Sequence, residues 1–256
     1  MIVSGINFAK TRIQRWKEEM SNGVESKNLM EIRSLLASLN IFPLTTDLEF
    51  LVLRADAHMV LSDYNTAIEE YQRAVDGGYS DGSNNRLREN LQFCQLQQWT
   101  HVLVENIENR DAKEIRNSLN TLDILSTPKT CHVYTLIGDA YLALKDYKAA
   151  IEAYTKAAEG DYSDGDKDKW RENLQFCQLE QWKEVMLENI QNRDAKEIGN
   201  SLNTLDNLSS PKDGHIYTVL GDAHLVLQDY KAAIDSYTKA LEALSGMRDF
   251  SRPQYD

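Results

Sequence analysis

A chain of 256 residues, with 42% apolar and 27% charged residues, can form one or two ordinary domains or one extended array of helices. Twelve Gly and four Pro are too few for an all-β protein, and no apolar run is long enough to span a membrane, so we expect a cytoplasmic helical protein. The net charge of −12, divided as −2, −4 and −6 over residues 1–88, 89–171 and 172–256, disfavours nucleic acid and anionic membranes as partners.

The sequence repeats itself with an offset of 83 residues. Residues 89–160 and 172–243 are identical at 51 of 72 aligned positions, without a gap. We therefore predict three repeat units at residues 1–88, 89–171 and 172–244, followed by a C-terminal tail at 245–256. The first unit diverges, but it keeps three aromatic positions of the others: Trp16, Trp99 and Trp182; Tyr64, Tyr147 and Tyr230; Tyr71, Tyr154 and Tyr237.

In the first unit we predict a helical hairpin at about residues 48–77. Ala55 and Ala67 are small enough to let two antiparallel helices approach closely, and aromatic side chains would fill the space beside them. Asp63 falls at the turn, where its side chain can cap the following helix. Amphipathic helices without close pairing are the alternative.

The second unit repeats this hairpin at about residues 131–160, with Gly138 and Ala150 as the small residues and Asp146 at the turn. Before it, the segment from Asp111 to Glu114 is typical of a capping box that opens a helix, and Thr-Pro at 127–128 ends that helix.

The loop from Gly160 to Asp168 carries aspartates at alternate positions, as the first ligands of a calcium loop do. The remaining positions do not fit, because Lys169 replaces the required glycine and Gln175 the bidentate glutamate. We predict a solvated turn whose carboxylates favour the N-terminus of the next helix.

In the third unit, apolar residues recur at three- and four-residue steps and predict one long helix at about residues 169–192. A second helix is expected to begin after Asp194 and to end before Ser-Pro at 210–211. A third hairpin follows at about residues 214–244, with Asp229 at its turn.

These hairpins resemble the tetratricopeptide repeat, whose pattern places an aromatic residue, Leu, Gly, a second aromatic, Ala and a third aromatic at fixed spacing. The matching residues are Tyr134, Ile137, Gly138, Tyr141, Ala150 and Tyr154 in the second unit; Tyr217, Leu220, Gly221, His224, Ala233 and Tyr237 in the third; and Leu51, Arg54, Ala55, His58, Ala67 and Tyr71 in the first. His224 departs from the pattern, the first unit matches weakly, and all three units lack the closing proline.

A repeat of this family spans about 34 residues, so about 49 residues of each unit are left over. They have helical patterns and are predicted to form a second, degenerate hairpin. The resemblance therefore implies an all-α protein, a right-handed solenoid of about six helical hairpins and twelve helices.

The function that the resemblance implies is a non-catalytic protein–protein interaction scaffold or adaptor, in which the first helix of each hairpin lines a concave groove. The predicted peptide-binding residues on this face are Asp56, Met59, His132, Thr135, Asp139, Leu142, His215, Thr218, Asp222 and Leu225.

An aspartate recurs on this face in all three units, where family members that hold the acidic tail of heat-shock chaperones place Lys, Arg and Asn. Such a tail would be repelled, so a basic or amphipathic peptide or a partner helix is the expected ligand, and a co-chaperone role is disfavoured. Alternatively, the aspartates only solvate the helix or bond locally.

No motif for catalysis or for cofactor binding is present, and the five histidines lack metal-ligand spacing, so we predict no enzyme, no cofactor and no metal. Three cysteines without a C-x-x-C pair give no disulfide framework, and Cys94 and Cys177 are expected in the core.

The last predicted helix has no helix after it to cover its apolar face. Met247, Phe250 and Tyr255 could fold back over it, another chain could cover it, or the array could be longer; we favour another chain, with a homo-oligomer through the last helix as one form. This feature supports an alternative function, a structural repeat protein that stacks end to end.

Overall fold

The computed structural model describes residues 2–38, 47–79, 85–125, 127–160, 167–205, 208 and 212–249, with side chains from residue 13 onward except those of 167–169 and 246–249. Every regular element in these ranges is an α-helix, which confirms the all-α class. The chain groups into two compact units, Met1–Pro128 and Lys129–Asp256. The predicted 83-residue boundaries are a division of the sequence and stay a prediction.

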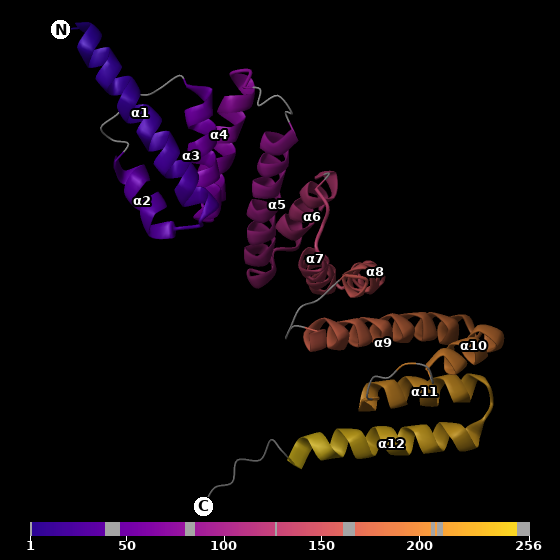
Figure 1. Cartoon of the computed structure of the whole chain (residues 1–256). Coiled ribbons are helices and arrows are strands. Elements are labelled where there is room, and N and C mark those ends of the chain that lie inside the picture. Colours follow the sequence, from indigo (N-terminus) through magenta and orange to yellow (C-terminus); the bar gives the residue numbers. More distant parts are fainter. Residues whose placement is uncertain are drawn as a thin grey trace, which may run out of the picture. The chain divides into compact units, whose positions relative to one another are not determined.

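In the unit Met1–Pro128, consecutive helices pack against one another, and α1 also packs against α3 (Figure 1). Its helices within the described residues are α1 (Ile2–Glu25), α2 (Leu29–Ser38), α3 (Leu48–Val60), α4 (Tyr64–Asp76), α5 (Asn85–Glu108) and α6 (Ala112–Ile124).

In the unit Lys129–Asp256, α8 packs against α9, and α9 packs against both α10 and α11. The helices of this unit in the described residues are α7 (Cys131–Ala143), α8 (Tyr147–Ala158), α9 (Lys167–Asn192), α10 (Ala195–Leu205), α11 (Gly214–Val226) and α12 (Tyr230–Asp249). The three predicted hairpins are thus α3–α4, α7–α8 and α11–α12.

Close pairing in these hairpins depends on a small residue in the first helix that faces a tyrosine of the second. A Cβ atom added at Gly138 would lie 2.5 Å from Cε1 of Tyr154, and one at Gly221 would lie 2.4 Å from Cε1 of Tyr237. The ring therefore packs directly on the glycine backbone, which confirms the role predicted for the small residues.

The turns of the three hairpins have the same construction. The Oδ1 atoms of Asp63, Asp146 and Asp229 accept hydrogen bonds from backbone amides three residues later, at 3.3, 3.1 and 3.1 Å, as the sequence predicts. The residue before each aspartate has a left-handed backbone, with φ of 62° at Ser62, 58° at Lys145 and 60° at Gln228. In each turn the amide of the aspartate bonds to the carbonyl five residues earlier, which closes the first helix.

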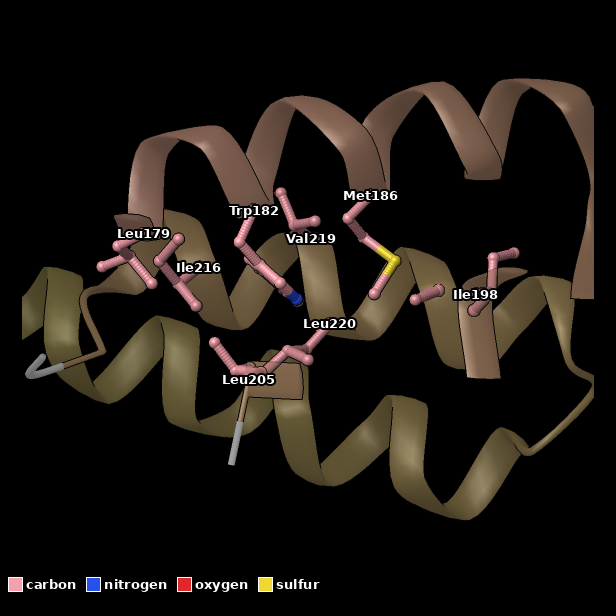
Figure 2. Close-up of a cluster of buried hydrophobic side chains, with 9 residues drawn as sticks. Leu179, Trp182, Met186, Ile198, Leu205, Ile216, Val219 and Leu220 are labelled. Atoms are coloured by element: carbon pink, nitrogen blue, oxygen red, sulfur yellow. The ribbon is translucent and has the colours of Figure 1, made fainter. Parts of the chain in front are cut away.

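The predicted degenerate hairpins are also helical pairs, and a buried tryptophan holds two of them, α1–α2 and α9–α10. Nε1 of Trp182 donates to the Ser201 carbonyl at 2.7 Å, and Nε1 of Trp16 donates to the Leu35 carbonyl at 3.1 Å. Figure 2 shows Trp182 in a core that joins α9, α10 and α11. The other side chains of this core are Leu179, Met186, Ile198, Leu205, Ile216, Val219, Leu220 and Ala223.

Some details differ from the sequence prediction. In the capping segment, Asp111 accepts from the amides of Lys113 and Glu114, but the carboxylate of Glu114 accepts from Nδ2 of Asn117. Helix α12 continues to Asp249, because no proline interrupts it before Pro253. The aspartates at 164, 166 and 168, Ser-Pro at 210–211, and the side chains of Met247, Phe250 and Tyr255 lie outside the described part of the chain.

Candidate functional site

The predicted peptide-binding residues form one stripe on the first helix of each hairpin, because they are spaced by three and four residues. On α7 and α11, His132, His215, Thr218 and Leu225 are exposed, whereas Thr135, Asp139, Leu142 and Asp222 are partly buried. On α3, Met59 is partly buried and Asp56 is only 2% exposed. The stripe is therefore accessible on the second and third hairpins and largely closed at the aspartate of the first.

Each of the three aspartates accepts a hydrogen bond from a tyrosine of its own hairpin. Oη of Tyr154 donates to Oδ1 of Asp139 at 2.6 Å, and Oη of Tyr237 donates to Oδ1 of Asp222 at 2.6 Å. Tyr71 donates to Asp56 in the same way. Local bonding, which the sequence left open as an alternative, is therefore present at all three aspartates.

An asparagine of the next helix completes two of these pairs. Nδ2 of Asn173 on α9 lies 3.0 Å from Oδ1 of Asp139, and Nδ2 of Asn90 on α5 lies 3.1 Å from Oδ1 of Asp56. Both amides also reach the tyrosine hydroxyl, at 3.3 Å and 3.2 Å. Asn90 and Asn173 were not predicted as site residues, although their 83-residue spacing is visible inside the ENLQFCQL segments.

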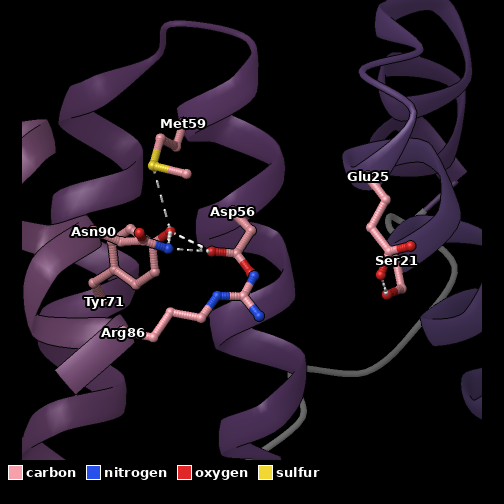
Figure 3. A network of polar contacts seen from close by, with 7 residues as sticks. All are labelled: Ser21, Glu25, Asp56, Met59, Tyr71, Arg86 and Asn90. Carbon is pink, nitrogen blue, oxygen red and sulfur yellow. Dashed lines mark hydrogen bonds and ion pairs between the residues drawn. The ribbon is translucent and has the colours of Figure 1, made fainter. Parts of the chain in front are cut away.

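The first hairpin adds a cation to its aspartate. Figure 3 shows Arg86 reaching Asp56 beside Tyr71 and Asn90, and its Nη2 lies 3.3 Å from Oδ2 of Asp56. Among the described residues, Oδ2 of Asp139 and Oδ2 of Asp222 have no hydrogen-bond partner. Lys169 stands at the position of Arg86 in the second unit, and its side chain lies outside the described part of the chain.

The environment shifts the pKa of several of these groups. Burial raises the pKa of Asp56 above its ordinary value, against the opposing effects of the Tyr71 hydroxyl, Arg86 and Asn90. Burial, followed by the hydrogen bond to Asp139, raises the pKa of Tyr154, and burial with the bond to Asp222 raises the pKa of Tyr237 to about 12. The tyrosines therefore stay protonated and act as donors at neutral pH.

The remaining stripe residues have few unused polar groups. The hydroxyls of Thr135 and Thr218 donate to the carbonyls of Cys131 and Gly214, four residues earlier in their own helices, at 3.1 and 2.9 Å. Leu142 packs against the core between α7–α8 and α9, while Leu225 is exposed. The stripe of α11 thus presents an apolar group, an imidazole and a carboxylate oxygen.

The described residues contain no group of three or more His, Cys, Asp or Glu side chains that could hold a metal ion. The cysteines form no disulfide, and burial raises the pKa of Cys94 to about 12 and of Cys177 to about 11. These two thiols lie in the hairpin cores, as predicted. No helix in the described ranges has the length and apolar content of a membrane span.

Paired helices that recur with one spacing define a helical repeat protein. The family model of the tetratricopeptide repeat matches residues 132–161 and 214–243, the hairpins α7–α8 and α11–α12. These two hairpins are therefore tetratricopeptide repeats, which generally mediate protein–protein interactions and are generally non-catalytic. No curated protein matches the chain.

Proposed function

We propose that this chain is a protein-binding scaffold or adaptor that holds a basic or amphipathic peptide, or a partner helix, in a groove lined by α7 and α11. The observation that carries this proposal is the second oxygen of Asp139 and of Asp222, which has no hydrogen-bond partner among the described side chains, in a stripe that also exposes histidine and leucine. A cationic side chain of the ligand would pair with that oxygen, and an apolar one would contact Leu225.

The same observation limits the proposed groove to two of the three hairpins. Asp56 already pairs with Arg86 and is buried, so α3 offers no comparable oxygen to a ligand. Residues 172–256 carry a net charge of −6, which also favours a basic ligand because it attracts a basic segment before contact. A ligand that ends in a carboxylate would meet repulsion at this stripe.

The proposal is tested with two labelled helical peptides that share their leucine positions and carry either lysine or glutamate elsewhere. In fluorescence anisotropy we expect the lysine peptide to bind more tightly, by at least about tenfold, and to weaken as salt is added. Asp139→Asn with Asp222→Asn removes both charges but keeps an acceptor for the tyrosines, so this variant should bind the lysine peptide less tightly.

A matched control is the pair Glu152→Gln and Glu242→Gln, which removes two exposed charges from α8 and α12. This control should bind the lysine peptide nearly as the natural sequence does. An equal loss of affinity in both variants would mean that only the general acidity of the chain attracts the lysine peptide. Tighter binding of the glutamate peptide would contradict the proposal.

The alternative function, a structural protein that stacks end to end, depends on a different surface. Its supporting observation is the exposed apolar face of α12, which the proposed groove does not use.

A further inference from the structure

The outer side of the last hairpin exposes apolar side chains, two of which stand at positions that are partly buried in both other hairpins. We call Tyr230, Ile234 and Leu241, together with the Asp222–Tyr237 pair, the terminal face; the three apolar residues are 62%, 67% and 70% exposed. In α8 the residues equivalent to Tyr230 and Ile234, Tyr147 and Ile151, are partly buried, and Tyr64 and Ile68 of α4 are also partly buried.

Helix α9 is the cover of the second hairpin. Its Trp170, Leu174 and Cys177 pack into the core formed by Ala150 and Tyr154, and Phe176 meets the ring of Tyr147 edge-on at 6.4 Å.

Helix α5 covers the first hairpin in the same way. Leu87, Leu91 and Cys94 pack on α3 and α4, and Phe93 lies edge-on to Tyr64 at 6.3 Å. In both covers an asparagine bonded to the aspartate and tyrosine adds a polar contact to a largely apolar interface.

The last hairpin has the same buried alanines and the same tyrosine–aspartate bond as the second hairpin, which α9 covers. Ala233 and Ala240 are buried as Ala150 and Ala157 are, and Tyr237 bonds to Asp222 as Tyr154 bonds to Asp139. A complementary cover is therefore a helix with an asparagine followed by a large apolar residue, in the register of α5 and α9.

Helix α1 has that register. Asn7 stands 83 residues before Asn90, Phe8 stands 83 before Leu91, and Thr11 stands 83 before Cys94. The C-terminal half of α1 already packs as α9 does, because Trp16 and Met20 lie in the core with α2 and α3, in the positions of Trp182 and Met186. Within the described residues, α1 packs on α2 and α3, the helices that follow it.

Charge favours the same pairing. Residues 1–17 contain Lys10, Arg12, Arg15 and Lys17 and no acidic residue, whereas residues 172–256 carry −6. Two positions depart from the covers. Ser4 stands where Leu87 and Trp170 occur. Lys10 stands where Phe93 and Phe176 occur and would place a cation near the ring of Tyr230.

We propose that the terminal face binds the N-terminal half of α1 from a second copy of this chain. The contact joins two different surfaces, so each added chain leaves one α1 and one terminal face unoccupied, unless the assembly closes into a ring. This inference does not rest on the proposed peptide groove, although the two surfaces share Asp222: its Oδ1 pairs with Tyr237 in the terminal face, and the groove would use its Oδ2.

The first experiment measures the mass of the full chain by sedimentation velocity over a wide concentration range. We expect the mass to rise above 29.3 kDa with concentration and to fall back as salt is added. Ile234→Glu should weaken association by at least about tenfold, because a charge would be buried against α1. The matched control is Ile124→Glu, at a residue that is 82% exposed on α6, and it should associate as the natural sequence does.

The second experiment mixes two variants that each lack one surface. Phe8→Asp impairs α1, and Ile234→Glu impairs the terminal face, so each alone should remain at 29.3 kDa. Their mixture should form complexes of two chains and no more, because it combines one intact α1 with one intact terminal face. Circular dichroism verifies that both variants stay helical.

Three results would overturn the proposal. A natural chain that stays at 29.3 kDa at every concentration would mean that the terminal face is covered within one chain or by another protein. Association that Ile234→Glu does not weaken would place the contact elsewhere. Variants that fail to pair when mixed would indicate a contact between two identical surfaces.

Discussion

At the scale of single residues, the aspartate of each hairpin is the best-defined polar group of the fold. It bonds to a tyrosine fifteen residues later, and in two hairpins also to an asparagine thirty-four residues later. In those two hairpins the carboxylate links both helices of the hairpin to the next helix. It therefore fixes how the three helices are rotated relative to one another.

We predict that Tyr154→Phe destabilises the unit Lys129–Asp256 more than Tyr237→Phe does. Loss of the Tyr154 hydroxyl takes a donor from Asp139 and an acceptor from Asn173 at a buried site, which costs about 1–3 kcal/mol. Tyr237 is partly exposed, so water can replace its hydroxyl and the loss should be nearer about 0.5 kcal/mol. Urea unfolding followed by circular dichroism measures both, and equal losses would contradict the difference in burial.

This network was only partly predictable. The repeated aspartates and tyrosines are visible in the sequence, but the spacing along a helix does not fix how two helices are rotated against each other. The sequence therefore left open whether Asp139 faces a ligand or bonds locally, and in the structure one of its oxygens bonds to Tyr154. Asn173 was missed because an asparagine within an apolar run gives no signal for the helix that it contacts.

At the scale of the helical elements, close approach in the hairpins is set by glycine against a tyrosine ring. Gly138 and Gly221 have no space for a Cβ atom, whereas a Cβ atom added at Gly199 on α10 would meet nothing within 4 Å. The first hairpin has Ala55 at the equivalent position and still buries Tyr71, so a methyl group is tolerated only after the ring has moved.

We predict opposite signs for two identical substitutions in one unit. Gly199→Ala should stabilise by about 0.5–1 kcal/mol, because it improves helix propensity in open space. Gly138→Ala should destabilise by about 1 kcal/mol, since the gain in propensity is smaller than the cost of displacing the Tyr154 ring. Thermal unfolding of the two variants provides the measurement; stabilisation by Gly138→Ala would show that the ring can move without cost.

The helices and their turns were the most predictable part of the structure. Asp63, Asp146 and Asp229 mark where the second helix of each hairpin begins, because a short acceptor at that position satisfies an otherwise unpaired amide. The end of α12 was less predictable, because Ser245 and Gly246 weaken a helix without ending it.

At the scale of the whole molecule, the two compact units differ in their buried charges. The unit Met1–Pro128 contains Asp56 and the Arg54–Glu70 pair, and burial raises the pKa of both carboxyl groups. At the positions of Arg54 and Glu70, the third hairpin has Leu220 and Ser236. The first unit therefore carries a cost of charge burial that depends on pH.

We predict that Asp56→Asn stabilises the chain at neutral pH and has little effect near pH 3.8, the ordinary pKa of this group. The pKa of Asp56 is higher in the folded chain than in the unfolded chain. The stability that its neutral form contributes is therefore fully present below the unfolded pKa, and it is lost as the pH rises through the folded pKa. Asparagine stays neutral and can still accept from Tyr71 and Asn90. Melting temperatures across this pH range provide the measurement, and a less stable variant at neutral pH would mean that the ion pair with Arg86 outweighs burial.

The repeat explains why the class of fold was predictable from the sequence. Near-identity of residues 89–160 and 172–243 means that similar local structures recur, which the helices of both segments confirm. The boundaries of the units and the handedness of the array stay predictions, because a repeat period has no natural starting residue.

Helix α9 packs on α8 through one side and on α10 and α11 through the other. Inserting a single residue between Cys177 and Trp182 would turn these two sides against each other by about 100° and disrupt one of them. Gain or loss of a complete copy by recombination between the near-identical stretches would instead return each side to a neighbour of the same kind. Such genes are therefore expected to change length in whole copies.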